Sequence, residues 1–330
     1  MTEPGRSISF VLPVYNERDS LSALLAEIEA SAASLGCEFE VVFVDDGSDD
    51  GSSELIAELA GRNDRVVGVF LRKHLGKSDA LAAGFEEAGG DVIVTLDSDG
   101  QDDPAETALL IAALDDGADL ASGWKRDRKD PWTRRWASKV FNRMTSLASG
   151  LRLHDFNCGF KAYRAECAKS IDVYGELHRF LPVLADQQGW RVVEVPVNHR
   201  PREHGRSKFG LERYRRGLLD LLTVMFIGRY RERPLHLFGG LGLLISAVGA
   251  GVLVYLLVVK ILGEAIGDRP LLILGVLLFV VGVQLVSLGL LAQMLIVQTR
   301  TAARRGSGRS PTVARVVRGE RALDGSRQPA

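Results

Sequence analysis

Two long stretches without a formally charged residue constrain what this chain can fold into. Pro234–Val259 and Pro270–Thr299 contain no Asp, Glu, Lys or Arg. Because about 20 apolar residues cross a bilayer, each stretch is long enough to span a membrane with some tilt. A pair of buried core helices is the alternative, but uncharged runs of this length are rare in soluble cores. The sequence therefore predicts two transmembrane helices within residues 235–298.

The charges that flank these stretches predict their orientation. Arginines precede the first stretch and follow the second, whereas the connector Lys260–Arg269 carries balanced charges. The positive-inside rule then places both flanks in the cytoplasm. We expect a cell (inner) membrane protein with two spans, and with the domain that precedes them and both termini on the cytoplasmic side.

Small residues recur along both predicted helices. Gly242, Ser246 and Ala250 are spaced by four, and Gly275, Gly282 and Gly289 are spaced by seven. Such stripes let helix backbones approach closely in lipid. The stripes allow close packing either between the two helices of one hairpin or between the helices of two protomers. A homo-oligomer formed through the membrane helices is therefore one of two alternatives.

Charge is segregated along the remaining chain. Residues 1–123 carry 26 acidic and 7 basic side chains, whereas residues 124–152, 200–233 and 300–330 are basic. This pattern excludes an ordinary soluble enzyme, a disordered chain and a DNA-binding module, so no nucleic-acid partner is expected. Residues 299–330 are rich in Arg, Gly, Ser and Pro, and we expect a disordered cytoplasmic tail held near anionic headgroups.

Strand and helix patterns alternate through the first part of the chain. Apolar, β-branched runs are followed by helical patterns, which predicts an α/β fold with a mostly parallel sheet and helices on both faces. The expected strands are Ile8–Leu12, Phe39–Val44, Val66–Leu71 and Val92–Leu96. The expected helices are Leu21–Leu35, Ser53–Ala60, Ser78–Ala88 and Pro104–Leu114. Residues 1–199 would form this domain, and residues 200–234 a basic loop with a juxtamembrane interfacial helix.

Polar residues follow three of the expected strands, at the edge of the sheet where ligands collect. They lie in the segments Pro13–Glu17, Asp45–Ser48 and Asp97–Gln101. Any one of them is typical of a polar turn, but three together indicate a site. Carboxylates two residues apart can share Mg²⁺ or Mn²⁺, which completes its shell with water and phosphate oxygens. Since no phosphate-binding glycine loop is present, a metal is expected to hold a diphosphate.

The ordered set of motifs resembles the inverting family 2 glycosyltransferases with a glycosyltransferase-A (Rossmann-like) fold. Within them it resembles the polyprenyl-phosphate group, the bactoprenol and dolichol-phosphate-mannose synthase-like enzymes. The resemblance covers about residues 7–298. Its motifs are Pro13–Glu17, Asp45–Ser48, Arg72–Lys77, Asp97–Pro104, Asp155–Lys161, Arg202–Lys208 and Asp220–Pro234. His74 and Ser98 stand where related chains more often carry Asn and Ala, and neither is expected to touch a side chain that the chemistry needs.

The resemblance implies a role for each matching residue. It implies a UDP- or GDP-linked sugar bound by Pro13, Tyr15, Glu17, Asp46, Lys77 and Asp97. It implies a Mg²⁺ or Mn²⁺ ion at Asp97, Asp99 and Gln101, with Asp99 and Asp155 as the catalytic carboxylates. Asp155 matches the proposed base, and a structural role beside cationic neighbours is its alternative.

The implied acceptor is a lipid phosphate, whose oxygen is already anionic and needs no strong base. Residues that match phosphate contacts, or that lie in basic clusters near the membrane, are Arg126, Arg135, Arg202, Ser207 and Lys208. Lys125 belongs to the first of these clusters. The helix opened by Arg134 carries one apolar stripe, formed by Trp136, Val140, Met144, Leu147 and Leu151. We expect this helix to lie at the membrane interface, with a core-facing helix as the alternative.

These expectations define a metal-dependent inverting transfer from a nucleotide sugar to a membrane polyprenyl phosphate, undecaprenyl, decaprenyl or dolichyl. A processive polysaccharide synthase is one alternative, but it should carry more spans and a Gln-x-x-Arg-Trp helix, whereas Gln187–Arg191 ends in Trp-Arg. A membrane-anchored relative that binds nucleotide sugar without turnover is the other. No covalent nucleophile is expected, because an inverting single displacement needs none.

Overall fold

The computed structural model describes most of the chain, in two compact units. One unit is an α/β sheet domain and the other is a helical hairpin. The described residues are 6–126, 138, 142–147, 149–175, 177–198, 200, 234–266, 270–303 and 312–318.

The α/β unit is built on one eight-stranded sheet with the order β7-β5-β6-β4-β1-β2-β3-β8. Its strands are β1 (Ser7–Val14), β2 (Glu38–Asp45), β3 (Val66–Leu71), β4 (Val92–Thr95), β5 (Leu120–Lys125), β6 (Lys161–Arg164), β7 (Val192–Val197) and β8 (Val313–Arg318). β1, β2, β3 and β4 are parallel, whereas β6 and β8 run antiparallel to their neighbours. The mostly parallel sheet predicted from the sequence is confirmed.

The central strands are buried on both faces. Val41, Val42, Phe43 and Val44 follow one another in β2, and none is exposed to solvent. Because successive side chains of a strand point to opposite faces, helices must cover both sides of the sheet. This explains why the sequence shows a continuous apolar run here, and not an alternating one.

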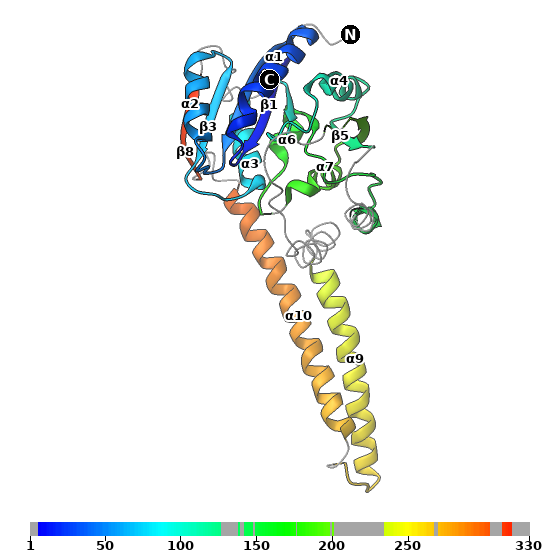
Figure 1. Cartoon of the computed structure of the whole chain (residues 1–330). Coiled ribbons are helices and arrows are strands. Elements are labelled where there is room, and N and C mark those ends of the chain that lie inside the picture. Colours follow the sequence, from blue (N-terminus) through cyan, green and yellow to red (C-terminus); the bar gives the residue numbers. More distant parts are fainter. Residues whose placement is uncertain are drawn as a thin grey trace. The chain divides into compact units, whose positions relative to one another are not determined.

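The helices up to residue 115 occupy the places that the sequence pattern predicts, and three short helical elements follow for which it predicts none (Figure 1). They are α1 (Arg18–Leu35), α2 (Ser52–Arg62), α3 (Lys77–Glu87), the 3-10 turn η1 (Pro104–Glu106), α4 (Thr107–Asp115), α6 (Ala165–Ser170), η2 (Leu177–Phe180) and α7 (Leu181–Gln187). The Pro104–Leu114 helix is divided, since Asp103 accepts a hydrogen bond from the Ala105 amide and caps a separate 3-10 turn.

The prediction of a disordered tail is wrong for Val313–Arg318. This segment forms β8, which lies beside β3 at the edge of the sheet (Figure 1). Val317 packs against the hydrophobic core. Three valines within six residues favour a strand, and β3 offers an open edge that pairs with it.

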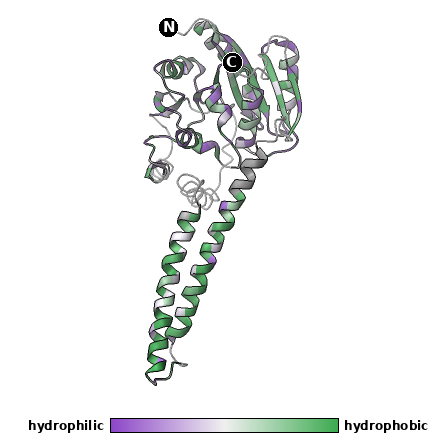
Figure 2. Cartoon of the chain, turned by 180° about the vertical axis from the view of Figure 1, so that it is seen from behind, coloured by the Kyte–Doolittle hydropathy of each residue, from purple (hydrophilic) through white to green (hydrophobic). Residues whose placement is uncertain are grey.

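The second unit consists of α9 (Pro234–Ile261) and α10 (Pro270–Ala303). Figure 2 shows both helices as predominantly hydrophobic outside the part of α10 drawn in grey, and Leu237–Ile261 and Pro270–Leu295 are long and apolar enough to cross a membrane. Only 17% and 11% of these spans are buried within the protein, so they lack the cover that a soluble core would give. The prediction of two membrane helices agrees with this exposure.

The small residues pack α9 against α10 within the hairpin. A Cβ added to Gly242 would lie 2.6 Å from the Gly282 carbonyl oxygen, and one added to Gly282 would lie 2.5 Å from the Ser246 nitrogen. A Cβ at Gly249 would lie 2.5 Å from the Phe279 nitrogen. The stripes therefore serve packing within the hairpin, and the homo-oligomer stays a prediction.

Candidate active site

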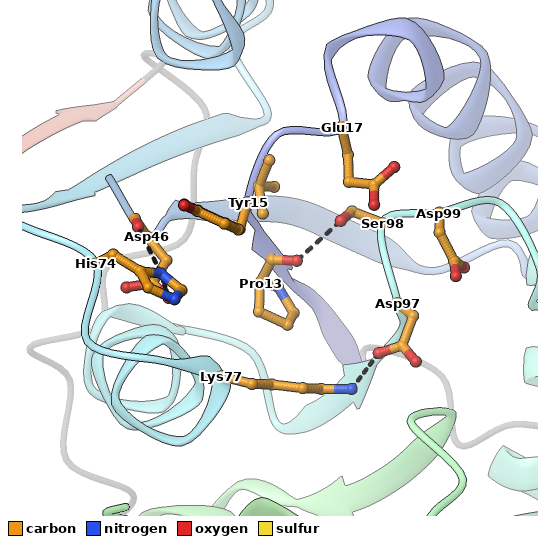
Figure 3. Close-up of a pocket in the computed structure, with 10 residues that line it drawn as sticks. Pro13, Tyr15, Glu17, Asp46, His74, Lys77, Asp97, Ser98 and Asp99 are labelled. Carbon is orange, nitrogen blue, oxygen red and sulfur yellow. Dashed lines mark hydrogen bonds and ion pairs between the residues drawn. The ribbon is translucent and has the colours of Figure 1, made fainter. Parts of the chain in front are cut away.

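An open cleft of about 280 Å³ lies at the carboxyl ends of the parallel strands. Its lining residues come from the end of β1, from the segments after β1, β2, β3 and β4, and from the start of α3, and Figure 3 shows their side chains converging. They are Pro13, Val14, Tyr15, Glu17, Asp46, His74, Lys77, Asp97, Ser98 and Asp99. The structure thus brings together Pro13, Tyr15, Glu17, Asp46, Lys77, Asp97 and Asp99, which the resemblance assigns to the donor and the metal.

The loop after β1 is pinned to the loop after β2. Asn16 has a φ of 55°, a left-handed conformation that is uncommon for a residue other than glycine. Its side chain donates to Asp49 at 2.7 Å and accepts from the Asp49 amide at 2.9 Å, while its own amide donates to Ser48 at 3.0 Å. These bonds fix the conformation that presents Tyr15 and Glu17 to the cleft.

Asp46 organises the segment after β3. Its carboxylate is buried and accepts the amides of Leu75 at 2.7 Å and Gly76 at 2.9 Å. Gly47 allows this approach, since a Cβ there would lie 2.8 Å from the His74 nitrogen. The predicted nucleotide contact therefore also holds residues 74–76 in place.

His74 belongs to the site, contrary to the expectation from the sequence. Its Nδ1 lies 2.8 Å from Asp46 Oδ2, and its ring stacks on Tyr15 with a centroid distance of 4.0 Å. Ser98 also touches the site, since its hydroxyl donates to the Pro13 carbonyl at 2.9 Å (Figure 3). The expectation that neither residue contacts a functional side chain is therefore wrong for His74, whereas the hydrogen bond of Ser98 goes to the main chain of Pro13. The expectation rested on comparing residue types, and the pairing with Asp46 depends on the fold.

Lysines surround Asp97. Lys77, the first residue of α3, reaches across the cleft and forms an ion pair with Asp97 Oδ1 (Figure 3). Burial alone would raise the pKa of Asp97, but Lys77, together with Lys125 and Lys161, outweighs burial and holds it well below its usual range. The carboxylate is therefore ionised at any physiological pH.

Asp99 supplies the second carboxylate, and its Oδ1 accepts the Gln101 amide at 3.2 Å. Among the described residues no group of three or more acidic, His or Cys side chains surrounds one point. A site with one or two carboxylates is nevertheless what Mg²⁺ or Mn²⁺ uses when substrate phosphates complete its shell. The side chains of Asp97 and Asp99, both facing the cleft, fit such an ion.

A buried ion pair lies beneath the Asp97–Gln101 loop. Lys125 Nζ lies 2.6 Å from Asp102 Oδ1, with exposed side-chain fractions of 9% and 0%. Asp102 Oδ2 accepts the Asp97 amide at 3.4 Å. Lys125 therefore supports the loop from within, and its assignment to an exposed basic cluster for the acceptor is wrong.

Asp155 does not line the cleft. Its side chain is 2% exposed, and Oδ1 accepts the Asn157 amide at 3.0 Å. Its own amide donates to Glu194 Oε1 at 2.8 Å, and Glu194 also binds His154. This arrangement is typical of a residue that orders the Asp155–Lys161 segment, and the catalytic role stays a prediction.

Two further titratable groups near the cleft are held neutral. Burial raises the pKa of the Cys158 thiol to about 12, so this side chain is not a nucleophile. Burial, followed by the charge of Lys77, lowers the pKa of His178 to about 3. His178 Nδ1 and the Ser78 hydroxyl lie 3.0 Å apart, which fixes the start of α3 against η2.

Of the residues predicted to bind the acceptor phosphate, the structure describes Arg126 alone. Arg126 is exposed, with its guanidinium 6.0 Å from the centroid of the Trp124 ring. Arg135, Arg202, Ser207 and Lys208 lie outside the described residues, as do Trp136 and Val140 of the predicted apolar stripe.

Of the described residues of that stripe, Met144 and Leu147 lie in a helical segment over residues 142–147, whereas Leu151 lies outside a helix and is half-buried. Met144 is 40% exposed and Leu147 is 78% exposed, whereas Thr145 is fully buried. Apolar side chains therefore face away from the domain here. This contradicts the core-facing alternative for Met144 and Leu147 and is typical of a surface that meets another apolar phase.

A family model described as glycosyl transferase family 2 matches residues 9–171. The chain belongs to this family, and the protein is a glycosyltransferase. The dodecaprenyl-phosphate galacturonate synthase of Rhizobium johnstonii is 38% identical over 87% of each chain. An undecaprenyl-phosphate 4-deoxy-4-formamido-L-arabinose transferase of Edwardsiella ictaluri is 37% identical over 87% of each chain.

Solved structures share the fold of the α/β unit. The glucosyl-3-phosphoglycerate synthase of Mycobacterium tuberculosis, solved with Mn²⁺ and UDP, is 22% identical with a TM-score of 0.52, covering 67% of this chain and 79% of that one. The mannosyl-3-phosphoglycerate synthase of Rubrobacter xylanophilus is 18% identical with a TM-score of 0.53, covering 67% of this chain and 73% of that one. These similarities confirm the glycosyltransferase-A fold expected from the sequence.

Proposed function

We propose that this protein transfers a sugar, with inversion, from a nucleotide sugar to the phosphate of a membrane polyprenyl phosphate. The observation that carries the proposal is a cleft with the two carboxylates Asp97 and Asp99 just after β4, in a chain that also bears two helices long and apolar enough to span a membrane. The similar relatives, named as polyprenyl-phosphate sugar transferases, agree with both features.

On the donor side, Pro13, Tyr15, Glu17 and Asp46 would contact the nucleoside of a UDP- or GDP-linked sugar. Asp97 and Asp99, with Gln101, would hold Mg²⁺ or Mn²⁺, which neutralises charge on the departing diphosphate when bound. The Mn²⁺ found with UDP in a fold relative supports a divalent ion. Lys77 lies beside the metal carboxylates, where its cation would also stabilise the diphosphate.

On the acceptor side, the attacking phosphate oxygen is already anionic. The site must therefore position this oxygen, and it does not need to deprotonate it. Arg126, Arg135, Arg202, Ser207 and Lys208 would hold the phosphate. Asp155 would act by ordering the Asp155–Lys161 segment or as the base that the resemblance implies. The exposed Met144 and Leu147 would rest on the bilayer that carries the lipid chain.

The pairing of β8 with β3 supports the expected topology. β8 follows α10 in the chain and belongs to the same sheet as the residues that precede α9. A chain that leaves one side of a membrane and returns to it must cross an even number of times, which two spans provide. We infer that the catalytic domain and β8 share one side, and the positive-inside rule makes it the cytoplasmic side of the cell membrane.

The test is direct. Purified full-length protein is incubated with undecaprenyl phosphate, with Mg²⁺ or Mn²⁺ and with a panel of UDP- and GDP-sugars. The mass of the lipid product is then measured by mass spectrometry. We expect one lipid-phosphate sugar, formed with inversion at the anomeric carbon and absent when EDTA is added. Chain products with several sugars would indicate a processive synthase, and binding without any product a non-catalytic relative.

A further inference from the structure

The C-terminal strand β8 lies where the donor cleft is built. It runs antiparallel to β3, with Leu71 opposite Val313 and Val67 opposite Arg318. The ladder continues beyond both strands, because the Arg72 amide donates to the Thr312 carbonyl at 3.1 Å. β8 therefore holds the chain at the point where it leaves β3 for the cleft.

The segment that starts at Arg72 carries a large part of the cleft. Leu75 and Gly76 bind the buried Asp46, His74 stacks on Tyr15, and Lys77 pairs with Asp97. These contacts fix the segment at its far end. At its near end the hydrogen bond to Thr312 fixes the backbone of Arg72.

The opposite end of β8 is fastened by an ion pair. Arg318 Nη2 lies 2.5 Å from Glu87 Oε2 and also donates to the Glu87 carbonyl at 3.2 Å. Glu87 is 5% exposed and ends α3, the helix that Lys77 begins. Within β8, Val317 packs against the core and the Arg315 guanidinium lies 5.6 Å from the Phe70 ring centroid.

We propose that β8 is a positioning element of the donor site, which holds the segment Arg72–Lys77 in the conformation that binds the nucleotide. β8 contacts both β3, which leads into this segment, and Glu87, which ends the helix that follows it. Detaching β8 would free one edge of β3 and the first residue of the segment together. The inference rests on the proposed function, since it takes the cleft as the nucleotide site.

The experiment uses full-length protein in detergent and the variant Arg318→Glu, which sets a like charge against the buried Glu87. The matched control is Arg62→Glu, the same reversal at the exposed pair that Arg62 forms with Glu58 on α2. Binding of UDP and of GDP, each with Mn²⁺, is measured by calorimetry. Hydrogen exchange is followed in peptides that cover residues 72–77, 92–95 and 312–318. The Michaelis constants for donor and acceptor are measured with the sugar nucleotide that the wild type uses.

For Arg318→Glu we expect a Kd for the bound nucleotide that is about tenfold higher. Exchange should be faster over residues 72–77 and 312–318 and unchanged over β4, and only the donor Michaelis constant should rise. The control should match the wild type. If exchange shows β8 detached while the nucleotide Kd and the exchange of 72–77 stay at wild-type values, the proposal is wrong.

Two further arms distinguish a general loss of stability from a failure of the donor site. If Arg318→Glu lowers the thermal midpoint of the whole domain and speeds exchange everywhere, the milder Arg318→Ala is compared in the same way. Uniform loss in both variants would show that β8 only stabilises the fold, which overturns the proposal. If the wild type binds neither nucleotide, the proposed donor site fails, whereas exchange over residues 72–77 still shows whether β8 holds that segment.

Discussion

Replacing Lys125 by Met should destabilise the catalytic domain and loosen the Asp97–Gln101 loop, which we propose binds the metal ion. The Lys125–Asp102 pair is separated by 2.6 Å, and at an effective dielectric constant of about 20 this corresponds to about 6 kcal/mol of attraction. Several kcal/mol of desolvation per ion offset it, so the net contribution of the intact pair is small. Removing Lys125 alone leaves the carboxylate of Asp102, whose side chain is fully buried, without its cation.

We therefore expect Lys125→Met to lower the free energy of unfolding by about 3–5 kcal/mol. Asp102→Asn should cost a similar amount, whereas the double variant Lys125→Met/Asp102→Asn should recover most of the loss, because no unpaired charge remains. Arg62→Met, at an exposed pair on α2, is the control and should change stability by about 0.5 kcal/mol or less.

The assay is urea unfolding in a mild detergent followed by tryptophan fluorescence. All four tryptophans precede the membrane helices, so they report on the catalytic domain. Two results would refute the reasoning: a loss in Lys125→Met no larger than in the control, or a double variant as unstable as the two single variants added together. Since Asp102 also accepts the Asp97 amide, the single variants should raise the metal concentration needed for half-maximal activity.

Three other perturbations test separate parts of the site. Asp99→Asn should reduce turnover by at least about 100-fold without changing the thermal midpoint, and full activity of the wild type in EDTA would refute a metal role. Met144→Glu with Leu147→Glu should impair transfer to long-chain polyprenyl phosphate in membranes far more than to a short soluble prenyl phosphate, and equal loss with both would exclude interfacial docking. In the folded protein the pKa of His178 is lowered from 6.5 to about 3. Between pH 6.5 and pH 3 the unfolded state therefore binds one proton more than the folded state, so the free energy of unfolding falls as the pH falls. His178→Gln should remove that slope, at most about 1.4 kcal/mol per pH unit, from unfolding midpoints measured across the window, and an unchanged slope would contradict it.

The convergence of the residues that we propose bind the donor was predictable, because it follows a local rule. Tyr15, Asp46 and Asp97 each come directly after a buried apolar strand, and the carboxyl ends of parallel strands meet at one edge. Their convergence therefore follows from the order of elements, without knowledge of any side-chain contact.

Pairing between side chains was not predictable in the same way. Lys125 lies next to Arg126 in a basic run, which favours a solvated cluster, yet strand alternation turns Lys125 inward toward Asp102. From the sequence, His74 is expected to replace Asn without effect on the site. In the structure its ring contacts both Asp46 and Tyr15. The first error comes from judging a charge by its neighbours in sequence, and the second from comparing residue types. In both cases the partner lies more than 20 residues away in the sequence.

β8 shows a third limit of prediction from the sequence. The residues of this segment favour a strand, but nothing in the sequence shows that the segment pairs with β3. Val313, Val316 and Val317 favour a strand, but a lone six-residue run among Arg, Gly and Ser residues is equally typical of a disordered tail. The run becomes a strand because β3 ends the parallel series and exposes an unpaired edge, and because Glu87 is buried near that edge and needs a cation. Since Thr312, directly before this strand, also accepts the Arg72 amide, a single pairing event closes the edge of the sheet, neutralises a buried carboxylate and supports the segment that lines the proposed donor cleft.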